Sequence, residues 1–408
     1  MKRAMTGNEV MAEAMRQIRP DVVAAYPITP ATEVVQIFAG FVADGVVDTE
    51  FIPAESEHSA MSACIGASAA GARAMTSTSS QGLALMWEML YITSGLRLPI
   101  VLAEVNRALS SPINIHCDHS DTMGARDSGW LQIYSENAQE AYDNMIQAIR
   151  IAEACRIPVM VTQDGFIISH GMEVVEILED TEVADFIGEY KPAYSVLDID
   201  HPKTVGAIDF TDYYFEHKMQ TIQAMRDAGK YITEVAEDFK KRFQRSYSFF
   251  EEYKLADAEI AIVALGSVCG TAKVVVDELR KEGIKAGLLK LRVFRPFPSH
   301  LLAQAILGCL AIAVLDRADG LSGAGGPLFV EVKSALYDHL HRETIFPITP
   351  GVFDEAEMIP SPPIVKNYVY GLGGRDMRKE HLREVFLELK EAMKGDRGES
   401  VRYIGVRG

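Results

Sequence analysis

The feature that most constrains the fold is a series of short, mainly apolar runs separated by helix-length segments. These runs cover residues 21–26, 73–77, 99–105, 158–162, 258–266 and 310–316. Strands that are apolar on both faces belong in parallel sheets, because helices cover both faces of such sheets. We therefore predict an α/β fold built on doubly wound parallel sheets.

The segments between these runs predict further helices and strands. Helices are expected at 6–19, 31–43, 56–72, 81–95, 137–155, 270–282 and 378–394, and further strands at 49–52, 285–293 and 366–374. The alternation stops in 172–215, which we interpret as an excursion over the surface, and 217–253 is expected to be a long charged connecting helix. With 408 residues the chain is long enough for two domains, predicted as 1–254 and 255–408.

Charge and cysteine content exclude several classes of protein. Lys and Arg number 40 against 57 Asp and Glu, a net charge of −17, which argues against binding to duplex nucleic acid or to an anionic membrane. The five cysteines form no CxxC pair, which argues against a zinc ribbon or an iron–sulfur cluster held by this chain alone. Scattered cysteines and the lack of a membrane-length apolar run or a secretory signal predict a cytoplasmic protein.

Three segments that follow predicted strands are candidates for a site. Tyr26–Pro30 (YPITP) ends one strand, and ligands bind at the carboxyl ends of parallel strands. Two prolines fix Thr29, whose hydroxyl could donate to a ligand; the alternative is that Thr29 is a helix N-cap. The second segment, 53–60, holds Glu55 and Glu57 before a helix of Ala, Ser and Gly. One of these carboxylates is either buried against a ligand nitrogen or simply solvated.

The third segment begins with Arg107, whose planar fork suits a carboxylate ligand. Asp118, His119 and Asp121 follow in the same loop and could bind a metal, but we favour a role for His119 in ordering the loop. A fourth turn, 266–270, is Gly-rich and could hold a phosphate. It lacks the G-x-G-x-x-G pattern, so tight packing is the favoured interpretation.

Five motifs in order along the chain resemble one known family. They are Ala25–Pro30 (AYPITP), Glu55–Ala60 (ESEHSA), Ser80–Leu83 (SQGL), Asn106–Ala108 (NRA) and Gly371–Asp376 (GLGGRD). Together they resemble the alpha subunits of the 2-oxoacid:ferredoxin oxidoreductase family, in particular those of pyruvate:ferredoxin oxidoreductase, or pyruvate synthase. An apparent insertion at 343–363 has no assigned function, and its FPITP pentad is taken as a chance echo of YPITP.

The resemblance implies a fold, cofactors and roles. The first domain would be a pyrimidine-type thiamine-diphosphate-binding domain, and the second would be like the C-terminal domain of transketolase. Glu57 would hydrogen-bond to the pyrimidine ring of thiamine diphosphate, with Glu55 as its rival, and Pro27 and Thr29 would lie in the cofactor site. Thr29 and Arg107 would contact the 2-oxoacid.

The resemblance also implies partners. A beta subunit would supply the magnesium and diphosphate half of the cofactor site, and gamma- and delta-type subunits would carry further iron–sulfur clusters and help to bind coenzyme A. Because ferredoxins are acidic and this chain is too, ferredoxin is expected to dock on another subunit.

Three functions remain open from the sequence. The first is a pyruvate-specific subunit, with a 2-oxoisovalerate-specific subunit as the alternative within the family. The second is a non-catalytic nucleotide-binding protein that uses 266–270. The third is half of a thiamine-dependent carboligase without electron transfer.

Overall fold

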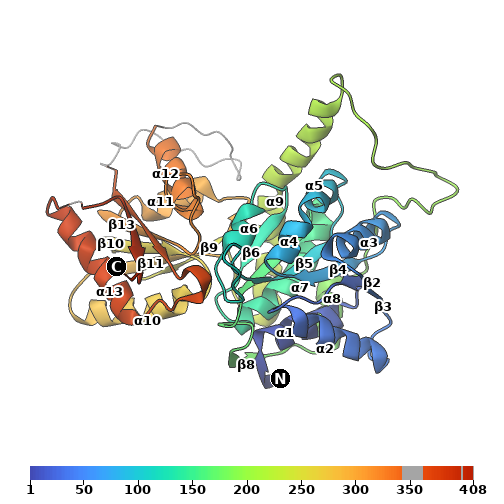
Figure 1. The fold of residues 1–408 in the computed structure, drawn as a ribbon, viewed down its shortest axis with the longest axis horizontal. Helices are drawn as coiled ribbons and strands as arrows, with labels where there is room; N and C mark the ends of the chain where they lie inside the picture. The colour runs from blue at the N-terminus through green and yellow to red at the C-terminus, as the bar shows by residue number, and fades with distance from the viewer. Residues whose placement is uncertain (342–361, 397, 408) are drawn as a thin grey trace.

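The computed structural model describes residues 1–341, 362–396 and 398–407, and it contains two α/β bodies, each around a mainly parallel sheet (Figure 1). The α/β prediction is confirmed. The predicted chance echo and insertion at 343–363 lie almost wholly outside the described residues. No described helix is both long and apolar enough to cross a bilayer.

The first sheet has the strand order β12-β6-β7-β5-β4-β2-β3. All neighbours are parallel except β12, which runs antiparallel to β6. Its strands are β2 (Val22–Ala25), β3 (Glu50–Pro53), β4 (Ala74–Thr78), β5 (Val101–Asn106), β6 (Leu131–Tyr134), β7 (Val159–Asp164) and β12 (Val293–Arg295). The parallel register places the carboxyl ends of β2 to β5 along one edge.

Helices cover both faces of this sheet. One face carries α1 (Gly7–Ile18), α2 (Thr32–Ala43), α7 (Ala138–Cys155), α8 (Asp180–Ile187) and α9 (Tyr214–Phe243). The other carries α3 (Glu57–Ala69), α4 (Gln81–Leu85) and α5 (Trp87–Gly95), and α6 (Ser120–Gly124) lies near the strand ends. The first turns of α9 and the segment before it project from the body (Figure 1).

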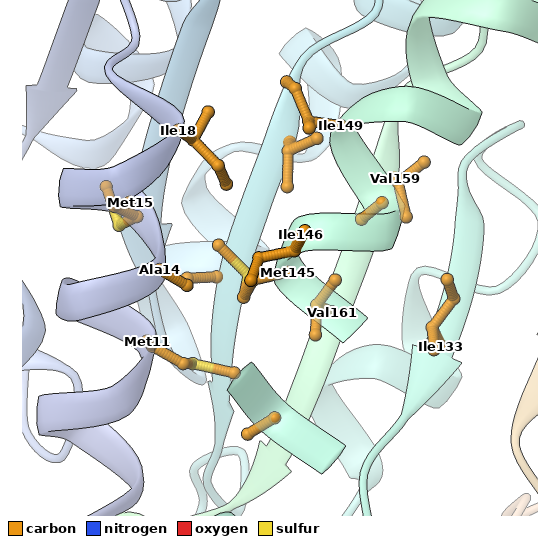
Figure 2. Close-up of a cluster of buried hydrophobic side chains, with 14 of the residues drawn as sticks. Met11, Ala14, Met15, Ile18, Ile133, Met145, Ile146, Ile149, Val159 and Val161 are labelled. Carbon is orange, nitrogen blue, oxygen red and sulfur yellow. The ribbon is translucent and has the colours of Figure 1, made fainter. Parts of the chain in front are cut away.

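The core under α1 shows why this layer forms. Met11, Met15 and Ile18 recur at helical spacing, and they face Met145 of α7 across the cluster in Figure 2. Thr6 starts α1 with a capping box, since its side chain accepts from Glu9 N and the Glu9 side chain accepts from Thr6 N. An apolar stripe and a polar start therefore fix the position of α1.

The second sheet has the order β15-β14-β13-β10-β11-β9, with β9 as its only antiparallel member among the described residues. Its strands are β9 (Phe250–Tyr253), β10 (Ile260–Ala264), β11 (Ala286–Leu291), β13 (Ala311–Asp316), β14 (Ile364–Tyr370) and β15 (Val401–Ile404). The helices α10 (Val268–Lys281) and α13 (Lys379–Met393) cover one face, and α11 (Ser299–Ile306) and α12 (Pro327–Leu340) cover the other. A 3₁₀ turn, η1 (Leu372–Gly374), follows β14.

Several elements differ from the prediction. The expected helix at 81–95 is two helices, α4 and α5, and the segment 172–215 contains β8 (Met172–Glu176) and α8. The strand β8 pairs with β1 (Lys2–Thr6) in a separate antiparallel ribbon. These short edge strands lack the long apolar run that identifies a buried parallel strand, so the sequence pattern did not reveal them.

The two bodies exchange strands across the predicted boundary. The strand β9 lies before residue 255 but pairs in the second sheet, and β12 lies after it but pairs in the first. Buried Lys290 of β11 adds a further tie, because its Nζ lies 2.7 Å from a Glu136 carboxylate oxygen and 2.8 Å from one of Glu251. Each sheet therefore contains one strand from the other side of the predicted boundary.

Candidate active site at the carboxyl ends of β2 to β5

Glu57 begins α3 directly after β3 and the turn that follows it. Ser56 caps the helix by accepting from Ser59 N at 3.2 Å, and Glu57, the next residue, is 6% exposed. No described residue hydrogen-bonds to its carboxylate. A methyl group placed on Gly82 would stand 2.7 Å from Glu57 Oε1 and would overlap Thr78 Oγ1. Gly82 therefore makes room for the Glu57 carboxylate.

Glu55 faces the other way. It is exposed, and its carboxylate accepts a short hydrogen bond from Ser59 Oγ, which lowers the pKa of Glu55. The structure therefore separates the two acids that the sequence left as alternatives. Glu57 is buried, and Glu55 is exposed to solvent.

Arg107 follows β5 and is 7% exposed. Its Nε donates to the Asn114 carbonyl at 2.7 Å, and its Nη1 donates to the Thr29 carbonyl at 2.9 Å. It forms no ion pair with a carboxylate anywhere in the described ranges, and its Nη2 has no hydrogen bond there. Burial lowers the pKa of Arg107, and Asp121 opposes that effect. A buried guanidinium with a free amino group is suited to bind an anionic ligand.

Thr29 lies in the loop after β2, and its side chain is exposed. The interpretation of Thr29 as an N-cap is wrong, because α2 starts at Thr32 and no side chain caps it. The loop is held instead by Asn8, whose Nδ2 donates to the Pro30 carbonyl at 2.8 Å. Pro27 is also exposed. Thr29 thus meets Arg107 through its carbonyl, and its hydroxyl is left free of described partners.

A polar chain links the Glu57 side of this edge to the Arg107 side. Ser80, which precedes Gly82, donates from Oγ to the Ala108 carbonyl at 2.7 Å. Its backbone N–H donates to Asp121, which also accepts from Arg107 N. Thr29, Arg107 and Glu57 therefore belong to one connected edge of the sheet, with Thr29 and Arg107 in direct contact.

The second domain closes over the Arg107 loop. Asn114 Nδ2 donates to the Gly373 carbonyl at 3.0 Å, and Gly373 N donates to Asp118 at 3.1 Å. Gly374 has a positive φ of 87°, and a side chain there would overlap His116. The Gly-rich motif after β14 therefore provides close contact with the loop that holds Arg107.

The acids and histidine of the 118–121 segment do not converge on a metal. His119 Nε2 lies 2.7 Å from Asp164 Oδ1, whereas Asp118 accepts from Ser120 and Asp121 accepts from backbone N–H groups. His119 thus orders the loop, as favoured above. One atom each of Cys117, His119 and Asp164 lie within 4.8 Å of one another. Asp164 already forms an ion pair with Arg317, whose Nη1 lies 2.9 Å from Asp164 Oδ2, and this guanidinium would repel a metal cation there.

The turn at 266–270 is filled by the chain's own carboxylate. Ser267 donates to Asp164 from both its N–H, at 3.0 Å, and its hydroxyl. Burial alone would raise the pKa of Asp164, but His119 and Arg317 hold it well below its usual range. The place that a phosphate would take is thus occupied by an acid of the first domain, which argues against the nucleotide-binding function.

Sequence reasoning missed several residues around the site. Asn114, Asp164 and Arg317 carry much of the network, and Glu104 is buried in β5 beside Asp121. A charged residue inside an apolar strand run, such as Glu104, was the one available signal. The others meet only across the fold.

Comparison with known proteins identifies the family of this chain. A family model described as the thiamine-diphosphate-binding part of pyruvate flavodoxin/ferredoxin oxidoreductase matches residues 13–237. A second, described as pyruvate:ferredoxin oxidoreductase core domain II, matches residues 258–352. The chain therefore carries a thiamine-diphosphate-binding domain.

Curated relatives match over nearly the full length. The chain is 54% identical to pyruvate synthase subunit PorA of Thermotoga maritima, over 99% of this chain and 98% of that one. It is 44% identical to PorA of Methanocaldococcus jannaschii, over 99% and 98% of the two chains. It is 42% identical to ketoisovalerate oxidoreductase subunit VorA of Pyrococcus abyssi, over 96% and 94%.

Solved structures share the fold. A 2-oxoglutarate:ferredoxin oxidoreductase from Magnetococcus marinus matches with a TM-score of 0.69 and 20% identity, over 96% of this chain and 65% of that one. A split-gene transketolase matches with a TM-score of 0.51 and 13% identity, over 96% and 99%. With the family models and the relatives, the conclusion is that this chain belongs to the pyruvate:ferredoxin oxidoreductase family, as one subunit of an oxidoreductase.

Proposed function

We propose that this chain is the alpha subunit of a pyruvate:ferredoxin oxidoreductase. The complex would convert pyruvate and coenzyme A to acetyl-CoA and CO2 and pass two electrons to ferredoxin, or run in reverse. The observation that carries this proposal is that a buried acid, Glu57, and a buried guanidinium, Arg107, both lie at one edge of a thiamine-diphosphate-binding domain.

The residues at this edge fit thiamine diphosphate. Glu57 is buried and has no hydrogen-bond partner among the described residues, so its carboxylate is available to a ring nitrogen of the cofactor. Pro27 and Thr29 flank the same edge. Thiamine diphosphate supplies the nucleophilic carbon and the electron sink that decarboxylation needs. Glu57 would hold a proton between itself and the pyrimidine ring.

Arg107 and Thr29 would bind the 2-oxoacid. The free Nη2 of Arg107 can donate to the carboxylate of the substrate, while its Nε and Nη1 stay fixed on the Asn114 and Thr29 carbonyls. The Thr29 hydroxyl, exposed and free of described partners, can donate to an oxygen of the same substrate. Arg107 would thus orient the carboxylate that leaves as CO2.

Pyruvate is the proposed substrate, and 2-oxoisovalerate is the second candidate. The 54% identity to a pyruvate synthase subunit favours pyruvate over the 42% identity to a ketoisovalerate oxidoreductase subunit. Turnover of the purified complex on each acid separates the two. Faster turnover on 2-oxoisovalerate would overturn the pyruvate assignment.

The proposed complex needs partner subunits. A beta subunit would hold magnesium and the diphosphate of the cofactor, and gamma- and delta-type subunits would hold iron–sulfur clusters and help to bind coenzyme A. Ferredoxin would dock on one of these subunits, because the charge of −17 on this chain repels an acidic protein. Five free, buried cysteines support a cytoplasmic location.

The test of Glu57 uses its neighbour as the control. In the assembled complex, Glu57→Gln should lower turnover at least a hundredfold, whereas Glu55→Gln, two residues away and exposed, should leave it within about twofold. Binding of thiamine diphosphate is measured separately by calorimetry. Near-normal turnover of Glu57→Gln would refute the assigned role.

The test of Arg107 separates substrate from cofactor. Arg107→Ala should raise the KM for pyruvate at least tenfold, because it removes a charge-assisted bond to the carboxylate, and should leave thiamine diphosphate affinity unchanged. Equal losses of both affinities would make Arg107 a structural residue.

A further inference from the structure

Two buried carboxyl groups lie directly beneath the loops that carry the proposed active site. Glu104 of β5 is fully buried, and Asp121 of α6 is 3% exposed. Neither oxygen of Glu104 has a hydrogen-bond partner of acceptable geometry among the described residues, and the Ser80 N–H, which lowers the pKa of Glu104, donates to Asp121. The Asp121 carboxyl group lies beside Glu104 and raises its pKa, and two neighbouring buried carboxyl groups can hydrogen-bond to each other only if one of them keeps its proton.

Asp121 is the acceptor of the pair. Its Oδ2 accepts the backbone N–H groups of Arg107, at 2.8 Å, and Ser80, at 3.1 Å. Its Oδ1 accepts from Asn106 Nδ2 at 2.9 Å and from Thr122 N at 2.8 Å. Four N–H donors favour a carboxylate on Asp121, so the proton belongs on Glu104.

The electrostatics agree with this division. Burial, followed by the neighbouring Asp121 carboxylate, raises the pKa of Glu104 well above its usual value. Burial raises the pKa of Asp121 to about 6, against the effect of its N–H donors. Both effects favour the proton on Glu104 and the negative charge on Asp121.

Asp121 lies between the two loops that follow β4 and β5 and hydrogen-bonds to both. The paired register between β4 and β5 ends at Thr78 and Glu104, so the loops beyond have no sheet hydrogen bonds to hold them together. The Ser79 and Ser80 hydroxyls donate to the Val105 and Ala108 carbonyls across this gap. Asp121 adds a charged tie, because a single oxygen of its carboxylate accepts the backbone N–H groups of both loops. One loop leads to Gly82, which packs on Glu57, and the other carries Arg107.

We infer that Glu104 and Asp121 form a positioning pair, in which protonated Glu104 donates to Asp121 and the Asp121 carboxylate sets the placement of Arg107 and of the Ser80–Gly82 turn. Both residues are buried, and we assign neither a contact with substrate or cofactor. The Asp121 charge also offsets the burial of the Arg107 guanidinium. This inference rests on the proposed roles of Arg107 and Glu57.

The kinetic test compares three variants in the assembled complex. Asp121→Asn replaces an acceptor oxygen with a donor and should raise the KM for pyruvate about tenfold, with a smaller fall in kcat. Glu104→Leu keeps the approximate volume but removes the donor, and should raise the KM in the same direction. Glu104→Gln keeps a neutral donor and should restore the KM to within about twofold of the wild type.

A spectroscopic test checks the proton itself. Infrared difference spectra of the wild-type complex against Glu104→Gln should show the C=O band of one protonated carboxyl group at neutral pH, lost in the variant. Thermal unfolding of each complex shows whether it is folded. If the Asp121→Asn complex does not assemble, the KM values of the two Glu104 variants and the infrared band still test whether Glu104 and Asp121 form the positioning pair.

Three results would overturn the inference. They are an unchanged KM in Asp121→Asn, equal defects in Glu104→Gln and Glu104→Leu, and no protonated carboxyl band in the wild type. A wild-type complex without turnover on any 2-oxoacid would instead refute the proposed function, while the infrared band would still test the pair.

Discussion

Gly82→Ala offers a direct test of how closely the Glu57 carboxylate is held. The new methyl group would stand 2.7 Å from Glu57 Oε1 and would overlap Thr78 Oγ1, so one of these side chains must move. Overpacking of this kind costs about 1–3 kcal/mol. Because α4 gains up to about 1 kcal/mol when alanine replaces glycine, the net loss of stability should stay near 2 kcal/mol or less. The chain should therefore still fold.

Turnover should respond more strongly than stability. Displacement of a catalytic group by about 1 Å can lower a rate about a hundredfold, and Glu57 is one of the two side chains, with Thr78, that the new methyl group would displace. The assay is pyruvate-dependent reduction of ferredoxin by the complex assembled with Gly82→Ala, together with its thermal unfolding midpoint. A folded variant with turnover within twofold of the wild type would show that the geometry of Glu57 is not what limits catalysis.

Gly40→Ala is the matched control. Gly40 lies within α2, and a methyl group there would meet no atom within 4 Å. The substitution should stabilise the chain by up to about 1 kcal/mol and leave turnover unchanged. A loss of turnover in Gly40→Ala would mean that alanine substitution affects the assay for reasons unrelated to Glu57.

Three further predictions concern the fold. Asp164→Asn leaves the buried Arg317 guanidinium without its carboxylate and should cost about 3–5 kcal/mol of stability, seen as a lower unfolding midpoint. The pKa of Asp164 is lower in the folded state than in the unfolded state, so its ionised form stabilises the fold above the unfolded pKa. The difference in unfolding free energy between wild type and Asp164→Asn should therefore shrink below about pH 4. A difference that grows there would contradict this. Met11→Ala should cost about 2–5 kcal/mol, unlike Met393→Ala on the surface, and equal effects would contradict the core of Figure 2. All five cysteines are buried, and burial raises the pKa of the Cys64 and Cys155 thiols to about 12, so a thiol reagent at pH 8 should label the protein only after denaturation, and rapid labelling of the native protein would contradict this.

The sequence alone determined the fold class, and it predicted where the candidate site residues would lie. Buried parallel strands such as 99–105 carry their signal locally, because a strand covered on both faces must be mainly apolar, as this one is apart from Glu104. The same signal placed Thr29, Glu57 and Arg107 after strands, and hence at one edge of a sheet. Short edge strands such as β1 and β8 carry no such pattern, since they bury only part of their surface.

Only the tertiary structure decided which of these side chains are buried and which residues they contact. The residue pattern around Glu55 and Glu57 did not distinguish them, although the family resemblance favoured Glu57. In the structure, Glu57 is buried against Gly82 and Glu55 is exposed. Asp164 and Arg317 are 153 positions apart, and no local pattern pairs them. Burial and pairing depend on segments brought together across the fold, so they are properties of its packing and not of any local stretch of sequence.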